Sequence, residues 1–112
     1  MSGHVFVVSE WLPKTGQEKE FWECCKELMN QTLNTEKGCI RAHVTRQISH
    51  PGSPGKTKFI IVLLQEYESV DAFTAHCESQ YVENFFKNRM EHLVEDWRCR
   101  LFDESEDYPF TS

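Results

Sequence analysis

The chain has 112 residues and a formal net charge of −6, and this length suits one domain that buries a single core without disulfides. Residues 103–112 hold four acidic residues and no basic one, so the rest of the chain carries a net charge of only −2. Lys/Arg-rich runs are absent and the acidic balance repels phosphate groups, so neither nucleic acid nor a membrane is an expected partner.

The first part of the chain predicts a strand, a helix and a second strand. Residues 5–11 are mostly β-forming and are apolar on both faces of the strand that they predict. From residue 17 to about residue 34, apolar residues recur with helical spacing, and Gly38 marks the end of this helix. Residues 40–45 then alternate between apolar and polar, which is typical of a sheet-edge strand with one buried face.

The second part of the chain predicts a loop, a central strand, a broken helix and a last strand. Residues 50–56 concentrate turn formers and predict a flexible hairpin loop. Residues 58–67 are apolar on both faces, which favours a position in the middle of a sheet. Ser69 can cap a second helix, which breaks near Ser79, and residues 97–102 supply a short last strand.

The order of these elements is β-α-β-β-α-β, which predicts an α+β, ferredoxin-like fold with a four-stranded antiparallel sheet. In this pattern the first and third strands are central, and these are the two strands that are apolar on both faces. Two helices cover only one face, so a second copy of the chain is the simplest cover for the other. Exposing about six large apolar side chains would cost about 1.5–3 kcal/mol each. We therefore expect a homodimer of one domain, residues 1–102, with an acidic tail at residues 103–112.

A distinctive segment runs from Gln65 to Ser79, at the junction of the predicted third strand and second helix. It comprises a strand that ends in an aromatic residue, an acidic–Ser pair, Ala-Phe, and a helical His shortly before a Ser. In this spacing the segment resembles the signature of the antibiotic-biosynthesis-monooxygenase family. In length and element order the resemblance extends over about residues 4–102.

The resemblance implies a dimeric α/β barrel, in which two sheets face one another and each protomer has a pocket between its sheet and its helices. Members of the family that are enzymes oxidise phenolic or quinol-like aromatics with molecular oxygen and use neither metal nor flavin. An electron-rich aromatic anion can itself reduce oxygen, so the protein need only deprotonate, orient and shield the substrate. We therefore expect a small aromatic substrate and no cofactor.

Five residues are candidates for this chemistry. His76 is the first candidate for a catalytic base, because an imidazole can accept a phenolic proton near neutral pH. Tyr67, at the end of the third strand, is a candidate catalytic hydrogen-bond donor to a substrate oxygen. Trp11, His43 and Phe73 are candidates for substrate binding. For each, a structural role in the core, on a sheet face or at an interface is the alternative.

The cysteine and histidine patterns predict neither disulfides nor a metal site. Five cysteines, an odd number with one adjacent pair and no Cys-x-x-Cys, predict reduced thiols in the core. The five histidines show neither His-x-His nor His-Glu-x-x-His spacing, so no metal ligation is expected. Signal-peptide features are lacking and no apolar run reaches the roughly 18 residues of a membrane span, so we expect a cytoplasmic protein.

Two functions follow as hypotheses. The first is a cofactor-independent monooxygenase that oxidises a quinol or polyphenol, with His76 as base or orienter and Tyr67 as hydrogen-bond donor. The second is a non-catalytic small-molecule-binding or stress-response module of the same fold, because no unambiguous catalytic set is present. An open cavity that ends on His76 favours the enzyme, whereas a pocket filled by Phe, Trp or Met side chains favours the binding module.

Overall fold

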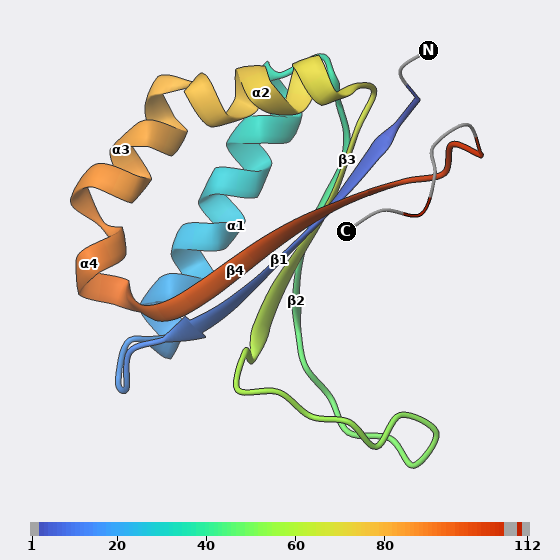
Figure 1. Cartoon of the computed structure of the whole chain (residues 1–112). Coiled ribbons are helices and arrows are strands. Elements are labelled where there is room, and N and C mark those ends of the chain that lie inside the picture. The colour runs from blue at the N-terminus through green and yellow to red at the C-terminus, as the bar shows by residue number, and fades with distance from the viewer. Residues whose placement is uncertain (1–2, 107–109, 111–112) are drawn as a thin grey trace.

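A computed structural model of the chain describes residues 3–106 and 110. Within these residues it contains a four-stranded antiparallel sheet with helices on one side (Figure 1). The elements in chain order are β1 (Val5–Pro13), α1 (Glu18–Thr35), β2 (Cys39–Arg46), β3 (Ile61–Tyr67), α2 (Val70–Glu78), α3 (Gln80–Asn88), α4 (Met90–Leu93) and β4 (Val94–Asp103). The strands lie in the order β2-β3-β1-β4, which confirms the predicted ferredoxin-like α+β fold with β1 and β3 in the centre.

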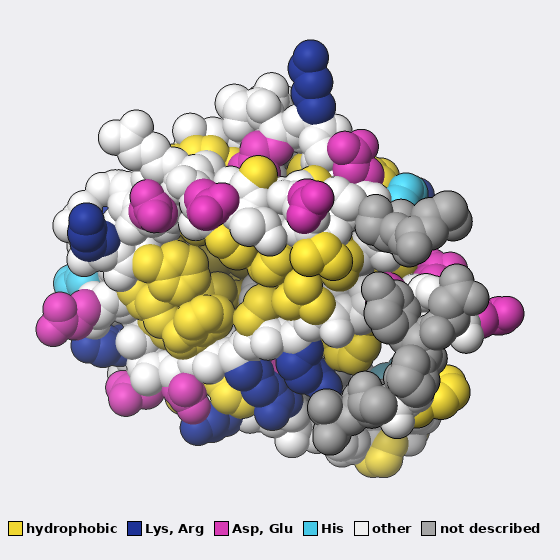
Figure 2. Space-filling view, turned by 45° about the horizontal axis from the view of Figure 1, so that its top comes forward, with side chains coloured by type: hydrophobic (Ala, Val, Ile, Leu, Met, Phe, Trp, Pro, Cys, Tyr) yellow, Lys and Arg dark blue, Asp and Glu magenta, His cyan; other side chains and the backbone are white. Residues whose placement is uncertain are grey.

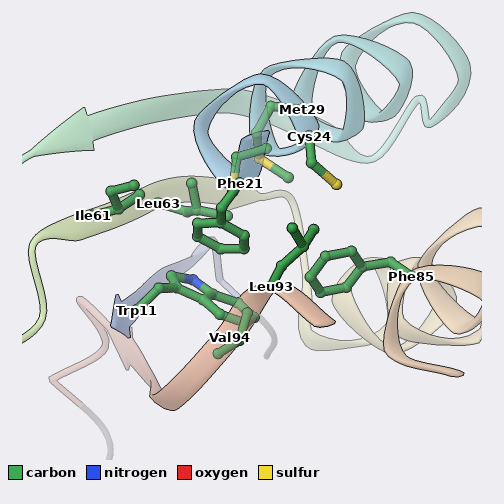
Figure 3. Close-up of a cluster of buried hydrophobic side chains, with 10 residues drawn as sticks. Trp11, Phe21, Cys24, Met29, Ile61, Leu63, Phe85, Leu93 and Val94 are labelled. Carbon is green, nitrogen blue, oxygen red and sulfur yellow. The ribbon is translucent and has the colours of Figure 1, made fainter. Parts of the chain in front are cut away.

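The main core lies between the helices and the sheet. Side chains alternate between the two faces along a strand, so Trp11 of β1 faces the helices together with Ile61 and Leu63 of β3. Phe21 from α1 and Phe85 from α3 pack onto these residues, and all five side chains point toward one another (Figure 3). Burying each of them stabilises the fold by about 1.5–3 kcal/mol.

The opposite face of the sheet carries no helix in the part of the chain that the structure describes, and we call it the open face (Figure 1). Strand alternation and register place apolar side chains of all three strands β1, β3 and β4 on it. These side chains are half-buried or exposed, and Leu64 and Phe102 are 40% and 46% exposed. The apolar residues of the open face are Phe6, Val8, Leu12, Val62, Leu64 and Phe102.

The open face also carries two paired carboxylates, which the sequence pattern did not predict. Glu10 lies 2.8 Å from Nε of Arg98 and 3.2 Å from Arg100. Glu66 lies 3.1 Å from Nε of Arg41. The hydrogen bond from Arg98 holds the pKa of Glu10 below its usual range, against the opposing effect of burial. The expectation of an apolar second face is therefore correct only in part, because Glu10 and Glu66 place charges on the central strands β1 and β3.

Two strands, β3 and β4, begin three residues away from their predicted starts. β3 begins at Ile61 instead of Lys58, and ahead of it the backbone N–H of Phe59 donates to the Thr57 hydroxyl at 3.1 Å. The Gln47 side chain makes two hydrogen bonds of 3.0 Å with the backbone of Thr57, just before the predicted start. β4 begins at Val94, ahead of the predicted residue 97. The register of β4 with β1 includes a bulge at this end, and it extends the pairing back to Val94.

The second helix starts and breaks where the sequence predicts. The Ser69 hydroxyl accepts a hydrogen bond of 3.1 Å from the backbone N–H of Ala72, which caps α2. Ser79 has extended backbone angles, φ −66° and ψ 146°, and separates α2 from α3. Residues 107–109 and 111–112 of the predicted acidic tail lie outside the described residues. No helix in the described part of the chain is long and apolar enough to cross a membrane.

Candidate functional site

A cavity of about 130 Å³ lies between the helices and the helix-facing side of the sheet. Phe86 and Trp97 lie on its wall and are 41% and 37% exposed, and we call them the mouth of the cavity. Figure 2 shows a broad hydrophobic area on one face of the molecule, between acidic and basic side chains. Such a lining keeps water away from a bound molecule. The largest side chains of the wall are Trp11, Phe21, Phe73, Phe85, Phe86 and Trp97.

The mouth of the cavity is organised by a stack of two tryptophans. The β1–β4 register sets Trp97 beside Trp11, and their rings stack with centroids 4.9 Å apart at an angle of 14°. The ring of Phe86, from α3, lies 5.2 Å from that of Trp97. Aromatic contacts of this kind contribute about 0.5–1.5 kcal/mol beyond area burial. The mouth is therefore an aromatic surface held by an edge strand and a helix.

His76 of α2 lies on the wall of the cavity and is only 7% exposed. Its ring packs 5.3 Å from the ring of Tyr67 and 6.1 Å from that of Phe73, measured between centroids. Nδ1 lies 2.9 Å from Oε2 of Glu36 and 3.1 Å from Oε1. A carboxylate can only accept, so Nδ1–H donates, and the second ring nitrogen, Nε2, is left as an acceptor in the neutral imidazole.

Glu36 is the residue that fixes the His76 ring. It is the C-terminal cap of α1, and its backbone N–H donates to the carbonyl of Thr32. The Tyr81 hydroxyl, from α3, donates to the same carboxylate and lies 3.1 Å from the Thr32 hydroxyl. The carboxylate thus joins α1, α2 and α3 at one point. Such an outer partner sets both the orientation and the tautomer of an imidazole.

Two buried polar residues of the sheet, Ser9 and Gln65, also lie on the wall of the cavity. The Ser9 hydroxyl accepts a hydrogen bond of 2.9 Å from Nε1 of Trp11. Oε1 of Gln65 accepts one of 2.5 Å from the Tyr67 hydroxyl. Polar groups are costly to bury in an apolar wall unless they are satisfied. The otherwise apolar cavity therefore has three polar points, at Ser9, Gln65 and His76.

The structure brings three of the five predicted site residues together. Trp11, Phe73 and His76 all lie on the cavity wall. Tyr67 is fully buried beside Phe73 and His76, and it reaches the cavity only through its hydrogen bond to Gln65. His43 does not join this group, because it pairs with Leu64 and its side chain lies on the open face. The substrate-binding role predicted for His43 therefore has no connection to this cavity.

The residues predicted for this site did not include Glu36, Gln65 or Ser9. Glu36 follows the last turn of a helix, where a charged residue usually faces solvent. A signal for Gln65 is available, because a polar residue at an inward position of a strand that is apolar on both faces needs a partner. Ser9 offers the same kind of signal two residues before Trp11 in β1.

Burial controls the protonation of several groups near the site. It raises the pKa of the Tyr67 phenol, with nearby Cys39 and Glu36 adding to the effect, so this hydroxyl is a hydrogen-bond donor. It also raises the pKa of the Cys77 and Cys99 thiols on the cavity wall. All five cysteines are free, but Cys77 and Cys99 are exposed, so the prediction of core thiols is wrong for these two.

Comparison with protein families matches residues 4–88 to the family described as Antibiotic biosynthesis monooxygenase. The match covers the elements from β1 to α3, including His76, Glu36 and Gln65. Comparison with curated proteins gives no match.

Solved structures share the fold at low sequence identity. A proposed antibiotic biosynthesis monooxygenase from Caulobacter crescentus CB15 aligns with a TM-score of 0.77 and 19% identity, over 94% of this chain and 92% of that one. A DABB family protein with a ferredoxin-like fold from Mesorhizobium loti gives 0.73 and 20%, over 92% and 98%. A dimeric protein with a ferredoxin-like fold from Bacteroides fragilis gives 0.72 and 14%, over 91% and 97%.

Proposed function

The chain belongs to the antibiotic biosynthesis monooxygenase family, and from this premise we propose that it oxidises a small phenolic or quinol-type aromatic with molecular oxygen, without a bound cofactor. The observation that carries the proposal is the cavity itself. Its wall is aromatic and aliphatic, and it includes an imidazole whose Nδ1 is held by a half-buried carboxylate. An apolar cavity with a few convergent polar groups is the usual form of a small-molecule site.

The proposed chemistry starts with proton transfer to His76. Nε2 accepts the phenolic proton, and Glu36 stabilises the imidazolium that forms. The resulting electron-rich anion reduces oxygen inside the apolar wall, which shields it from water. In net terms a hydroquinone and O₂ give a hydroxyquinone and water, so one oxygen atom replaces a ring hydrogen and the other leaves in water.

The open face supports the further proposal that the chain acts as a homodimer. Its apolar side chains include Leu64 and Phe102, which stay 40% and 46% exposed in one chain. The cavity lies on the other side of the sheet, so a second copy on the open face leaves the mouth accessible. The similar Bacteroides fragilis protein is described as dimeric. Five free cysteines suit a reducing compartment, and we propose a cytoplasmic location on that ground.

Oxygen uptake with a panel of hydroquinones, in buffers treated to remove metals, tests the proposed reaction. We expect turnover in the native protein and a loss of at least about a hundredfold in His76→Ala, the usual contribution of a general base. His92→Ala is the control, because His92 is exposed on α4, and it should leave turnover unchanged. Binding of ring compounds without any oxygen uptake would instead support the non-catalytic binding module.

A further inference from the structure

Gln65 occupies an unusual place in β3. Its inward-facing neighbours along the strand, Leu63 and Tyr67, are buried core residues, and Gln65 itself is only 7% exposed. An amide in such a position costs several tenths to a few kcal/mol unless its hydrogen bonds are made. Its location on the cavity wall indicates where the missing partner belongs.

The Tyr67 hydroxyl determines how the Gln65 amide is oriented. It donates to Oε1 at 2.5 Å, and burial raises its pKa, so it remains protonated and keeps this donor role. With Oε1 occupied, Nε2 of Gln65 is the group left to donate. Among the described residues, Nε2 has no hydrogen-bond partner. Every fully buried side-chain nitrogen of these residues does have a partner, so Nε2 is not fully buried. The amide nitrogen is therefore accessible at the cavity wall.

Ser9 adds a second donor on the same face of the sheet. Val7 lies opposite Gln65, and Ser9 lies opposite Leu63, so Ser9 and Gln65 are diagonal neighbours on adjacent strands. Because the Ser9 oxygen accepts from Trp11, its own hydrogen is left to donate. The sheet side of the cavity thus offers N–H and O–H donors, whereas the helix side offers the acceptor Nε2 of His76.

The size of the cavity limits what these groups can hold. Its volume is about 130 Å³. An engineered apolar cavity of roughly 150 Å³ in another protein binds benzene. The present cavity therefore has room for one aromatic ring, whereas two fused rings require the exposed side chains at the mouth to move.

We propose that the cavity is a binding site for a single aromatic ring with an oxygen substituent, and that Gln65, oriented by Tyr67, donates the hydrogen bond to that oxygen. This deepens the proposed function and rests on it for the identity of the site, since it names the ring size and the group that recognises the oxygen. Gln65 contacts the ligand directly, whereas Tyr67 is a positioning residue that acts through Gln65.

Binding without turnover tests this proposal. The intact protein is titrated without oxygen, and tryptophan fluorescence is followed because Trp11 and Trp97 lie on the cavity wall. Phenol, toluene and 1-naphthol are the probes, since phenol and toluene have the same size but only phenol carries an oxygen. We expect phenol to bind about tenfold more tightly than toluene, the worth of one hydrogen bond, and 1-naphthol to bind more weakly than phenol.

Two variants locate the source of this preference. Gln65→Leu should bind toluene as the native protein does, and phenol no better than toluene. Tyr67→Phe leaves the wall intact but frees the amide to rotate, so it should reduce the phenol preference without changing toluene binding. If Gln65→Leu fails to fold, the phenol preference of Tyr67→Phe decides whether the proposal holds. Equal native binding of phenol and toluene, an unchanged preference in the variants, or binding of 1-naphthol as tight as that of phenol would overturn the proposal.

The outcome is independent of catalysis. If the protein prefers phenol through Gln65 but consumes no oxygen, the proposed ligand site is supported and the proposed monooxygenase activity is excluded. If the protein consumes oxygen with quinols but shows no such preference, the proposed monooxygenase activity is supported and the proposed role of Gln65 is excluded.

Discussion

His76 and Glu36 are separated by 40 positions in the sequence, yet Nδ1 of the imidazole lies 2.9 Å from Oε2 of the carboxylate. The contact depends on the end of α1 meeting the last turn of α2. It gives the cavity a ring nitrogen of defined tautomer at its wall.

Replacing the carboxylate should impair turnover through the histidine. We expect Glu36→Gln to lower kcat/KM for a hydroquinone about ten- to a hundredfold, because the amide neither holds the tautomer nor stabilises an imidazolium. The two residues act as a unit, so Glu36→Gln combined with His76→Ala should be no slower than His76→Ala alone. Oxygen uptake by the two single variants and the double variant measures this coupling. A loss in the double variant equal to the product of the two single losses would contradict it.

Gly38 allows the approach of α2 that this contact needs. A Cβ at Gly38 would lie 2.6 Å from Cβ of Ala72, so Gly38→Ala must displace the helix. We expect a loss of about 1–3 kcal/mol in unfolding free energy, measured in urea, and partial recovery when Ala72→Gly is added. Gly16 is the comparison, because its φ of +86° strains the backbone of any other residue, whereas an added Cβ there would contact nothing. Ala72→Gly should therefore not relieve the destabilisation caused by Gly16→Ala.

The adjacent residues Phe85 and Phe86 should differ sharply in their effect on stability. Phe85 is 4% exposed in the core, whereas Phe86 is 41% exposed at the mouth of the cavity. We expect Phe85→Ala to cost about 3–5 kcal/mol, and Phe86→Ala about 1 kcal/mol from its contact with Trp97. Urea denaturation of the two variants provides the measurement. Similar losses would show that the two rings are equally buried in solution.

The pairing of Glu10 with Arg98 should make stability depend on pH. The folded-state pKa of Glu10 is lowered from its ordinary value of 4.5, so its contribution to stability is complete above that value and is lost as pH falls through the folded-state pKa. Glu10→Gln should therefore destabilise the protein at pH 7 but not in strong acid. Thermal unfolding at several pH values tests this, with Glu23→Gln on the exposed side of α1 as the control. A difference that persists unchanged into acid would contradict it.

The open face should control assembly. Leu64 of the open face and Leu33 of α1 have almost equal exposure, 40% and 42%. If the open face pairs two chains, Leu64→Glu should give a monomer at micromolar concentration, because it places a charge in an apolar interface. Leu33→Glu should remain a dimer. Analytical ultracentrifugation distinguishes the two results, and a monomeric native protein would exclude this interface.

The elements of the fold were predictable because each depends on local sequence. The helix start at Ser69 and the break at Ser79 follow from residues within one turn, and the central position of β3 follows from its two apolar faces. The start of β3 was misplaced, because the backbone N–H of Phe59 donates to the Thr57 hydroxyl, a local contact that strand propensity does not determine.

The site was predictable only in part. Trp11, Phe73 and His76 were predicted as candidates because each belongs to an apolar pattern or to the family segment, and all three lie on the cavity wall. Glu36 reaches the site through tertiary packing alone, and a charged residue after a helix is ordinarily solvated. His43 was predicted as a site residue from its residue type. The alternation of side chains along β2 instead places it on the open face, opposite Leu64.

The cavity and the open face use opposite sides of the same sheet, so alternate residues of β1 serve different tasks. Ser9 and Trp11 belong to the ligand side, and Glu10 belongs to the side proposed for assembly. A slip of one residue in the pairing of β1 would exchange these sets and point a carboxylate at the ligand. Faithful strand register is therefore a requirement for recognition and for assembly at once.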